Sequence, residues 1–245
     1  MIVLDNITLA YGDRTLLSDV SARFEKGTFT ALLGRNGCGK STLLRAIAGI
    51  GRPTAGRIEI QGLDMASTSP SQAARTVSFV TTQRVRITNL TCRQVAALGR
   101  APYTDWIGRL RAEDRRIVDE SLEAVGMSEF AGRTMDSISD GEAQRVMIAR
   151  ALAHQTPVIL LDEPTAFLDL PTRWQINDLL RHLARDEHKT ILCSTHDLEI
   201  SLSSCDAVAL VDTPRLIHRS VEQMRACGDI ERTFGIGLSA AARHI

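Results

Sequence analysis

The stretch Gly34–Ser41 reads Gly-Arg-Asn-Gly-Cys-Gly-Lys-Ser and matches the pattern G-x-x-x-x-G-K-S without a mismatch. Glycines in such a loop let successive backbone N–H groups converge on phosphate oxygens, and the following helix presents its positive N-terminus. Lys40 can reach the terminal phosphates, and the Ser41 hydroxyl can hold Mg²⁺. An apolar run at 28–33 precedes the loop and an amphipathic segment at 40–48 follows it, as the motif requires. The sequence therefore predicts a nucleoside triphosphate site.

A second element contributes carboxylates. The run Val158–Glu163 is a buried-strand pattern that ends in two acids. Asp162 is placed to hold Mg²⁺, directly or through water, and Glu163 could orient and polarise an attacking water. Two acids after a strand can also simply begin a loop. In a chain that carries the phosphate loop, the catalytic interpretation is the stronger one.

Short β-like runs alternate with helical patterns along most of the chain, which predicts an α/β protein with a mainly parallel sheet covered on both faces. A helical stretch from about 84 to 135 interrupts the alternation and is a candidate inserted subdomain. Helices are expected at 172–185 and within 91–125, the latter broken by the loop-like APYTDWIG. The expected strands are 2–11, 28–33, 57–61, 76–80, 157–161, 190–194 and 207–211.

Composition excludes several classes of protein. The 245 residues include 29 Lys+Arg and 29 Asp+Glu, a balance that argues against a general nucleic-acid-binding surface. No apolar run approaches the roughly 20 residues that span a bilayer, and the N-terminus lacks the pattern of a secretory signal. Five scattered cysteines without a CxxC pair indicate reduced thiols rather than zinc or disulfides. We expect a cytosolic chain, unless a partner holds it at a membrane.

Three further motifs make a family recognisable. ISDGEAQRVMIARALAH at 138–154 lies between the phosphate loop and the acids, while LLDEPTAFLD at 160–169 and STHD at 194–197 complete the order. Residues 1–212 thus resemble the ATP-binding cassette (ABC) ATPases. The resemblance implies one ABC ATPase domain over 1–245, with a P-loop NTPase core, an N-terminal antiparallel β subdomain and a helical signature subdomain inserted at about 84–155. ATP and Mg²⁺ are the implied cofactors.

The same resemblance assigns individual residues. Tyr11 matches the aromatic that stacks on adenine, and Gln83 matches the Q-loop glutamine that touches the metal and the attacking water. Asp169 matches a loop acid that communicates across a dimer, and His196 matches the histidine that contacts the γ-phosphate. Taken singly, each of these residues has an ordinary structural explanation, such as a half-buried strand tyrosine or a capping histidine. The phosphate loop and its helix supply the remaining cofactor-binding residues Gly34, Asn36, Gly37, Cys38, Gly39, Lys40, Ser41 and Thr42.

The segment Ile138–Glu142 resembles the family's LSGGQ signature, which binds the γ-phosphate of ATP held by the other subunit. Asp140 stands where glycine is usual, and Glu142 where glutamine is common. Ser139 and Glu142 form a capping box, and Asp140 adds about 0.3–1 kcal/mol through the helix dipole. A carboxylate about 4 Å from a phosphate charge would cost roughly 4 kcal/mol at an effective dielectric constant of about 20. We therefore expect Asp140 to turn away from the nucleotide while Ser139 and Gly141 face it.

The resemblance also suggests a transport role. The stretch 98–127 is similar to ATPase subunits of ferric-siderophore, haem and cobalamin importers, through ALGR at 97–100, Pro102-Tyr103 and Trp106–Arg109. It implies a homodimer of ATPase subunits with two copies of a transmembrane permease, and indirectly a substrate-binding protein, at the cytoplasmic face of the cell membrane. No nucleic acid is implied. An ATPase of another importer or an exporter, or a soluble ABC ATPase, remains the alternative.

Beyond Asp212 the sequence carries little information. The Gly-containing hairpin that closes the family's core is not evident after the last core strand, and residues 213–245 receive no function.

Overall fold

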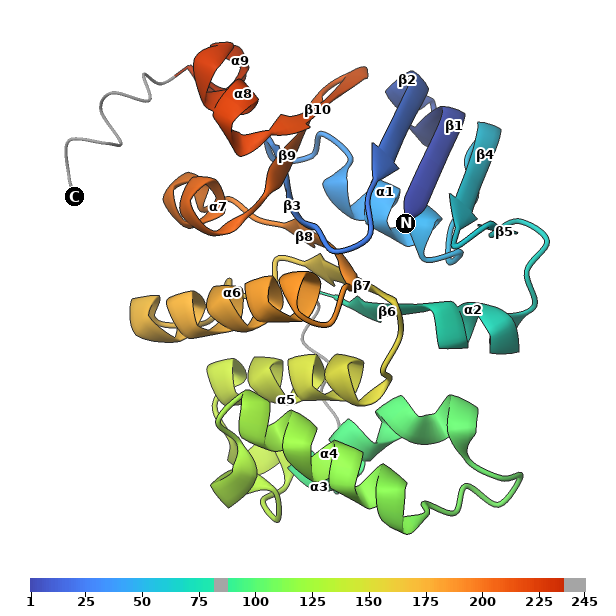
Figure 1. The fold of residues 1–245 in the computed structure, drawn as a ribbon, viewed down its shortest axis with the longest axis vertical. Helices are drawn as coiled ribbons and strands as arrows, with labels where there is room; N and C mark the ends of the chain where they lie inside the picture. The colour runs from blue at the N-terminus through green and yellow to red at the C-terminus, as the bar shows by residue number, and fades with distance from the viewer. Residues whose placement is uncertain (82–87, 236–245) are drawn as a thin grey trace.

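Two β-sheets organise the chain in the computed structural model, which describes residues 1–81 and 88–235. The larger sheet has the order β10-β9-β3-β8-β7-β6, and the strands from β9 to β6 are all parallel (Figure 1). The predicted α/β architecture with a mainly parallel sheet is confirmed. Its strands are β3 (Phe29–Gly34), β6 (Val77–Val80), β7 (Val158–Asp162), β8 (Thr190–Ser194), β9 (Ala207–Asp212) and β10 (Arg215–Ser220).

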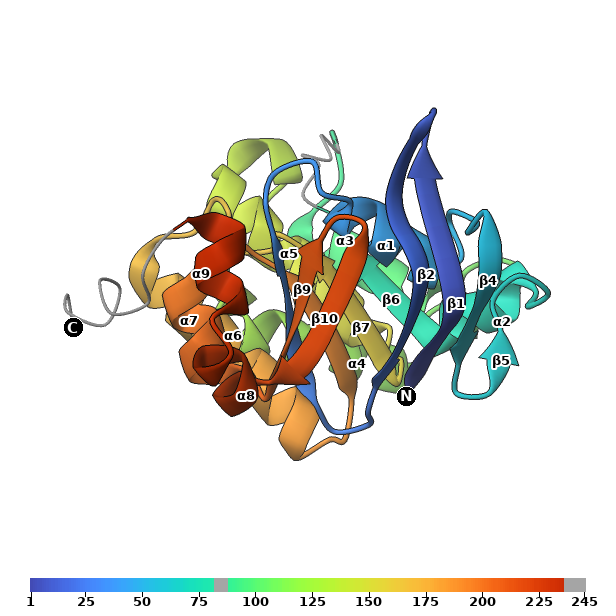
Figure 2. The same ribbon diagram turned by 90° about the horizontal axis from the view of Figure 1, so that it is seen from above.

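The smaller sheet is antiparallel, in the order β2-β1-β4-β5. It lies on the right in Figure 2, where the N-terminus is marked. It contains β1 (Ile2–Tyr11), β2 (Arg14–Phe24), β4 (Ala55–Ile60) and β5 (Leu63–Asp64). The sequence analysis did not identify β2. Its buried residues do not alternate strictly, because Leu16 and Leu17 are both buried and the pairing with β1 shifts register.

The larger sheet divides the interior into two apolar clusters. Ala31 and Leu33 of β3 pack into a cluster with the helices of the insertion, whereas Leu32 joins α1 and the small sheet on the other face. This is the two-residue period of a strand that is covered on both faces. The covering helices outside the insertion include α1 (Lys40–Ile47), α2 (Pro70–Thr76), α6 (Leu170–Arg185) and α7 (Leu198–Ser204).

The predicted helical insertion forms a separate layer below the sheet in Figure 1. Its elements are α3 (Cys92–Ala97), the 3₁₀ turn η1 (Leu98–Tyr103), α4 (Ala112–Ala124), the 3₁₀ turns η2 (Ser128–Phe130) and η3 (Met135–Ser137), and α5 (Asp140–Ala153). The insertion contributes buried apolar side chains to the core cluster, among them Val95, Val118 and Val146. α5 leads directly into β7, so the insertion is joined to the strand that carries the two acids.

The chain after β9 corrects the sequence analysis. A hairpin does follow the last core strand: β9 and β10 pair from Ala207–Ser220 to Asp212–Arg215, and the turn is Thr213-Pro214, without glycine. Because this turn contains no glycine, the expected Gly-containing pattern does not mark it. Two short helices, α8 (Val221–Ala226) and α9 (Asp229–Phe234), follow.

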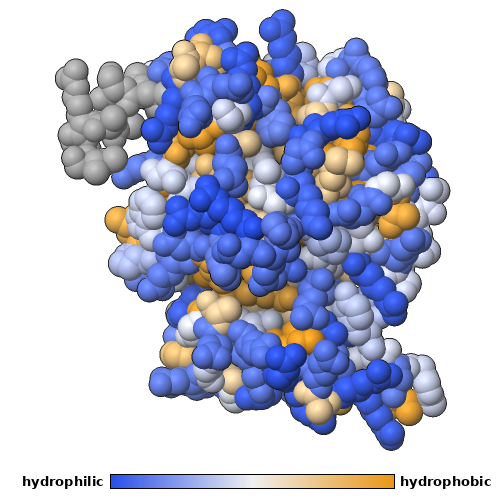
Figure 3. Space-filling view, viewed as in Figure 1, coloured by the Kyte–Doolittle hydropathy of each residue, from blue (hydrophilic) through white to orange (hydrophobic). Residues whose placement is uncertain are grey.

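Within residues 1–81 and 88–235, every helix is too short or too polar to cross a bilayer. The face shown in Figure 3 is correspondingly dominated by hydrophilic residues, with apolar colour in small patches.

Candidate functional site

The phosphate loop connects β3 to α1. Gly34 ends the strand, and Lys40 begins the helix after a left-handed Gly39 with φ 111°. Gly37 also has a positive φ, 73°. The Lys40 side chain is buried within its own loop, where Nζ donates to Gly34 O at 2.9 Å. The glycines thus provide a backbone that L side chains rarely adopt, and the loop curls around one ammonium group.

A cleft of about 720 Å³ opens above this loop. It brings together segments from four parts of the chain, and Tyr11 at its rim is 77% exposed. That exposure contradicts the half-buried strand tyrosine that the sequence left as an alternative. Gly34 and Cys38 do not line the cleft, because they pack against each other beneath it. The lining residues are Tyr11, Arg14, Leu16, Asn36, Gly37, Gly39, Lys40, Ser41, Thr42, Glu163 and His196.

The two acids lie at the carboxyl end of β7 and are positioned by a serine from the next strand. Ser194 Oγ donates to Asp162 Oδ1 at 2.7 Å, and the Glu163 backbone N–H donates to Ser194 Oγ at 3.0 Å. Asp162 and Ser194 are register partners in the parallel β7–β8 pair. The sequence analysis missed Ser194, although its position at the end of the adjacent predicted strand was the available signal. Arg14 and Leu16 of the cleft were missed with β2.

Glu163 and His196 form a close pair at the mouth of the cleft. His196 Nε2 lies 2.5 Å from Glu163 Oε1, and both side chains are partly exposed. Glu163 has φ 49°, so its backbone is held in a conformation uncommon for a non-glycine residue. The arrangement places a carboxylate and an imidazole, two groups able to hold or move a proton, beside the phosphate loop.

The signature segment begins α5. Ser139 is the N-cap, and the predicted capping box is confirmed: Ser139 N–H donates to Glu142 Oε2 at 2.7 Å, and Glu142 N–H donates to Ser139 Oγ. The Ser139 hydroxyl also donates to Glu142 Oε2 at 2.7 Å. These hydrogen bonds to the ionised carboxylate lower the pKa of Glu142 below its usual value.

A second cavity, of about 490 Å³, lies at this helix start. Asp169 reaches it as the N-cap of α6, where its carboxylate accepts from Thr172 N–H at 3.1 Å. Glycine at 141 suits this close packing, because a Cβ at this position would stand 3.1 Å from Phe167 O and the neighbouring backbone would have to shift by a few tenths of an ångström. The lining residues are Ser139, Asp140, Gly141, Glu142, Arg145, Phe167, Leu168, Asp169 and Thr172, of which Arg145, Phe167, Leu168 and Thr172 were not predicted.

The predicted site residues that line a cavity therefore fall into two groups. No lining residue is shared between the cleft at the phosphate loop and the cavity at the signature. Gln83, predicted to contact the metal, lies outside the described residues.

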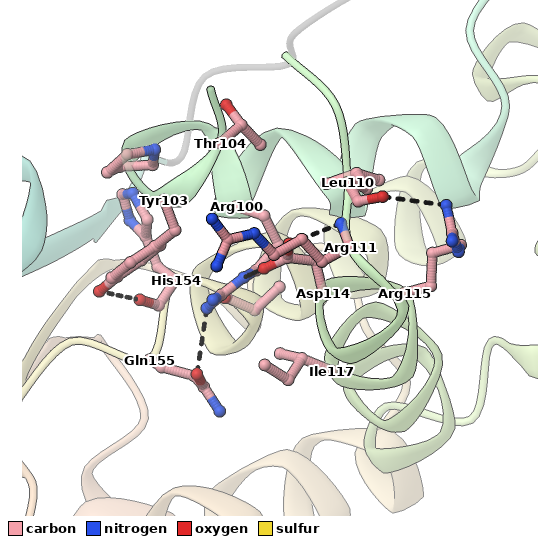
Figure 4. Close-up of polar contacts among 12 residues, drawn as sticks. Arg100, Tyr103, Thr104, Leu110, Arg111, Asp114, Arg115, Ile117, His154 and Gln155 are labelled. Carbon is pink, nitrogen blue, oxygen red and sulfur yellow. Dashed lines mark hydrogen bonds and ion pairs between the residues drawn. The ribbon is translucent and has the colours of Figure 1, made fainter. Parts of the chain in front are cut away.

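The stretch 98–127 contains a buried polar network (Figure 4). Arg100 and Asp114 are 6% and 4% exposed and form an ion pair at 2.9 Å. Arg100 also donates to Ala153 O and Gln155 Oε1 and lies over the Tyr103 ring, while Tyr103 donates to His154 O at 3.0 Å. Backbone and guanidinium hydrogen bonds hold the pKa of Asp114 below its usual range. These residues fix η1 and α4 on the end of α5.

Several known proteins have similar sequences. The family profile described as ABC transporter matches residues 17–166. The achromobactin transport ATP-binding protein CbrD of Dickeya dadantii is 37% identical over 205 residues, which cover 84% of this chain and 76% of that protein. The iron(3+)-hydroxamate import ATP-binding protein FhuC of Bacillus subtilis is 39% identical over 79% of this chain and 72% of its own length.

Solved structures share the fold. An inward-facing putative metal-chelate type ABC transporter superposes with a TM-score of 0.84 at 25% identity, covering 96% of this chain and 89% of that one. The dimeric bacterial ABC transporter cassette MJ0796 gives 0.81 at 29% identity, covering 90% and 99%. Together with the phosphate loop, the paired acids and the signature helix, these likenesses establish that the chain belongs to the ABC transporter family and is an ATP-binding cassette ATPase.

Proposed function

We propose that two copies of this chain bind two ATP molecules between them and power an importer of iron chelates or cobalamin. One observation carries the dimer: the phosphate loop and the signature belong to cavities with no common lining residue. We therefore expect a nucleotide seated on one loop to meet the signature helix of a second copy. The dimeric cassette among the structural neighbours supports this arrangement.

Within each copy, Tyr11 stacks on adenine, and the loop N–H groups with Lys40 hold the phosphates. Glu163 orients the attacking water, and His196 contacts the γ-phosphate and the Glu163 carboxylate. Gln83 joins this group as the residue that senses the metal and the water. Ser139, Gly141 and Asp169 act from the other copy. Residues of about 84–155 form the signature subdomain of a single ABC ATPase domain.

The residues at the loop fit Mg²⁺. Ser41 and Asp162 offer oxygen ligands, which this ion prefers, and the Ser194 hydroxyl fixes the orientation of the Asp162 carboxylate at 2.7 Å. No cluster of three or more His, Cys, Asp or Glu capable of holding a metal occurs in residues 1–81 and 88–235. One carboxylate and one hydroxyl, completed by phosphate oxygens and water, is the usual magnesium arrangement in nucleotide sites. When bound, the ion offsets negative charge on the β- and γ-phosphates.

Closure of the dimer follows from the difference in nucleotide affinity between the two states. ATP touches both copies only in the closed dimer, so binding shifts the population toward it, and loss of the γ-phosphate removes the contact with Ser139. Opening and closing then move the helical insertion of each copy. Transport follows if a permease subunit rests on that insertion and holds the chain at the cytoplasmic face of the membrane.

The names of several relatives support the proposed substrate class. Their names include achromobactin, hydroxamate and petrobactin systems, and also cobalamin import. These are large chelates of a metal. The permease and an external binding protein would recognise such a chelate, and this chain would supply the energy.

The dimer is tested with Glu163→Gln, which removes the base but keeps the shape of the site. We expect light scattering to show a stable dimer with ATP and a monomer with ADP. A monomer under both conditions would contradict the proposal.

The substrate class is tested in vesicles that contain the chain with its co-purified permease. A ferric siderophore plus its binding protein should raise the ATPase rate, whereas a vesicle without the binding protein should not respond. If cobalamin with its binding protein raises the ATPase rate and a ferric siderophore does not, the substrate class narrows to cobalamin. If neither substrate raises the rate, another importer or an exporter is favoured.

A further inference from the structure

A residue far along the sequence makes a hydrogen bond to the phosphate loop. Thr213 Oγ1, in the turn between β9 and β10, donates to the backbone carbonyl of Cys38 at 3.1 Å, across 175 residues of sequence. Thr213 belongs to the part of the chain to which the sequence assigned no function. Its hydroxyl therefore reaches the middle of the loop that holds Lys40 and Ser41.

The underside of the loop packs on the strand that leads into this turn. Gly34 is the register partner of Val211 on β9, and a Cβ on Gly34 would stand 2.7 Å from Cys38 Sγ and 2.8 Å from Val211 O. Cys38 itself is 6% exposed. The loop is therefore closely packed against β9 at Gly34 and Cys38.

The peptide bond between Cys38 and Gly39 gives the hydrogen bond its significance. In a trans peptide the C=O and the N–H point in opposite directions. Gly39 lines the nucleotide cleft and Cys38 does not. Fixing the Cys38 carbonyl on Thr213, away from the cleft, therefore keeps the Gly39 N–H directed to the side where a phosphate would bind.

Rotation of this peptide is otherwise easy. Gly37 and Gly39 flank Cys38 with φ 73° and 111°, and glycine adopts both signs of φ at little cost. A rotated peptide would present a carbonyl oxygen to the phosphate, which is repulsive. The hydrogen bond from Thr213 to the Cys38 carbonyl thus disfavours this rotated conformer of the loop.

The turn that carries Thr213 is held by its own hairpin and by β2. Six register pairs join β9 to β10, and the Ser18 N–H of β2 donates to Pro214 O at 2.9 Å. Figure 2 shows the end of this hairpin beside β2. Thr213 is thereby presented from a fixed turn.

We infer that Thr213 is a positioning residue for nucleotide binding: it orients the Cys38–Gly39 peptide so that the Gly39 N–H faces the phosphates. This inference rests on the proposal that the loop binds phosphate. It gives the β9–β10 turn a part in ATP binding, although the turn does not line the cleft.

The experiment measures the dissociation constant of ADP by calorimetry on the full chain, because ADP is not hydrolysed. Thr213→Val removes the hydroxyl and keeps the shape, and we expect the dissociation constant to rise about three- to tenfold, the usual effect of one hydrogen bond. Thr213→Ser keeps a donor and should bind ADP within about twofold of the parent. The kcat at saturating ATP should change less than KM.

Thr54→Val is the matched control, since Thr54 Oγ1, just before β4, donates to Thr8 O of β1 at 2.9 Å. It should cost a similar amount of stability in thermal unfolding and leave the ADP affinity unchanged. Equal weakening by Thr54→Val, or unchanged affinity in Thr213→Val, would overturn the inference. Lys40→Ala distinguishes failure of this inference from failure of the proposed function. If Lys40→Ala binds ADP normally, the loop is not the phosphate site, and the proposed function fails.

Discussion

The nucleotide cleft and the signature cavity differ in the charged and polar groups that each would offer to a phosphate. The cleft offers Lys40, loop N–H groups and a helix start, together with the Glu163–His196 pair. The signature cavity offers a capped helix start whose nearest side chains include Asp140, Glu142 and Asp169, with Arg145 as the cation in its lining. The cleft is thus equipped to bind nucleotide by itself, whereas the signature is suited to a phosphate already neutralised by another copy. Substitutions in the cleft should change binding and chemistry, and those in the signature only the step that needs two copies.

The largest effect is expected for Glu163→Gln, which removes the general base. Steady-state ATP turnover should fall by about 10²–10⁴-fold, while the ADP dissociation constant stays within about threefold. A phosphate-release assay with calorimetry measures both. Turnover near that of the parent would remove Glu163 from the chemistry and leave the cleft as a binding site only.

Lys40→Ala should come next. Removing the buried ammonium takes away a charged hydrogen bond to the phosphates, and the ADP dissociation constant should rise by about 100-fold. Lys189→Ala is the control, because Lys189 also donates to a backbone carbonyl, Thr156 O, and lies away from both cavities. Equal effects of the two variants would show that stability, not phosphate contact, causes the loss.

Ser139→Ala tests the other half of the comparison. Turnover should fall about tenfold through the lost hydrogen bond to the γ-phosphate, with the ADP affinity of the monomer unchanged. The variant also loses a helix cap worth about 1 kcal/mol. Ser69→Ala removes the corresponding cap of α2, where Ser69 Oγ accepts from Gln72 N–H at 3.3 Å, and should lower the unfolding midpoint without slowing turnover. If both variants slow turnover equally, the role of Ser139 is only to start the helix.

The smallest effect is expected for Asp140→Gly. If the Asp140 side chain turns away from the nucleotide, ATP affinity and turnover should stay within about threefold of the parent, because removal of the charge relieves little repulsion. Measurement of KM and kcat at low and at physiological salt checks this. A large gain in either parameter would mean that the carboxylate faces the phosphate and restrains closure.

Much of the cleft was predictable because its chemistry is local in sequence. The glycines, Lys40 and Ser41 lie within eight consecutive residues, and the acids directly follow an apolar strand. Ser194 was not recognised, since its role depends on the parallel pairing of β7 with β8, which its place at the end of a predicted strand does not by itself reveal. The same reason applies to Arg100 and Asp114, which look like members of a solvated segment until the fold buries them together.

By itself, the sequence determined the phosphate loop, the paired acids, the capped signature helix and the alternation that gives a parallel sheet, because periodicity and turn chemistry act between near neighbours. Only the tertiary structure decided that Ser194 orients Asp162 and that Thr213 reaches Cys38. These contacts join residues separated by tens to hundreds of positions. Their geometry is set by strand order and packing, which a linear pattern does not specify.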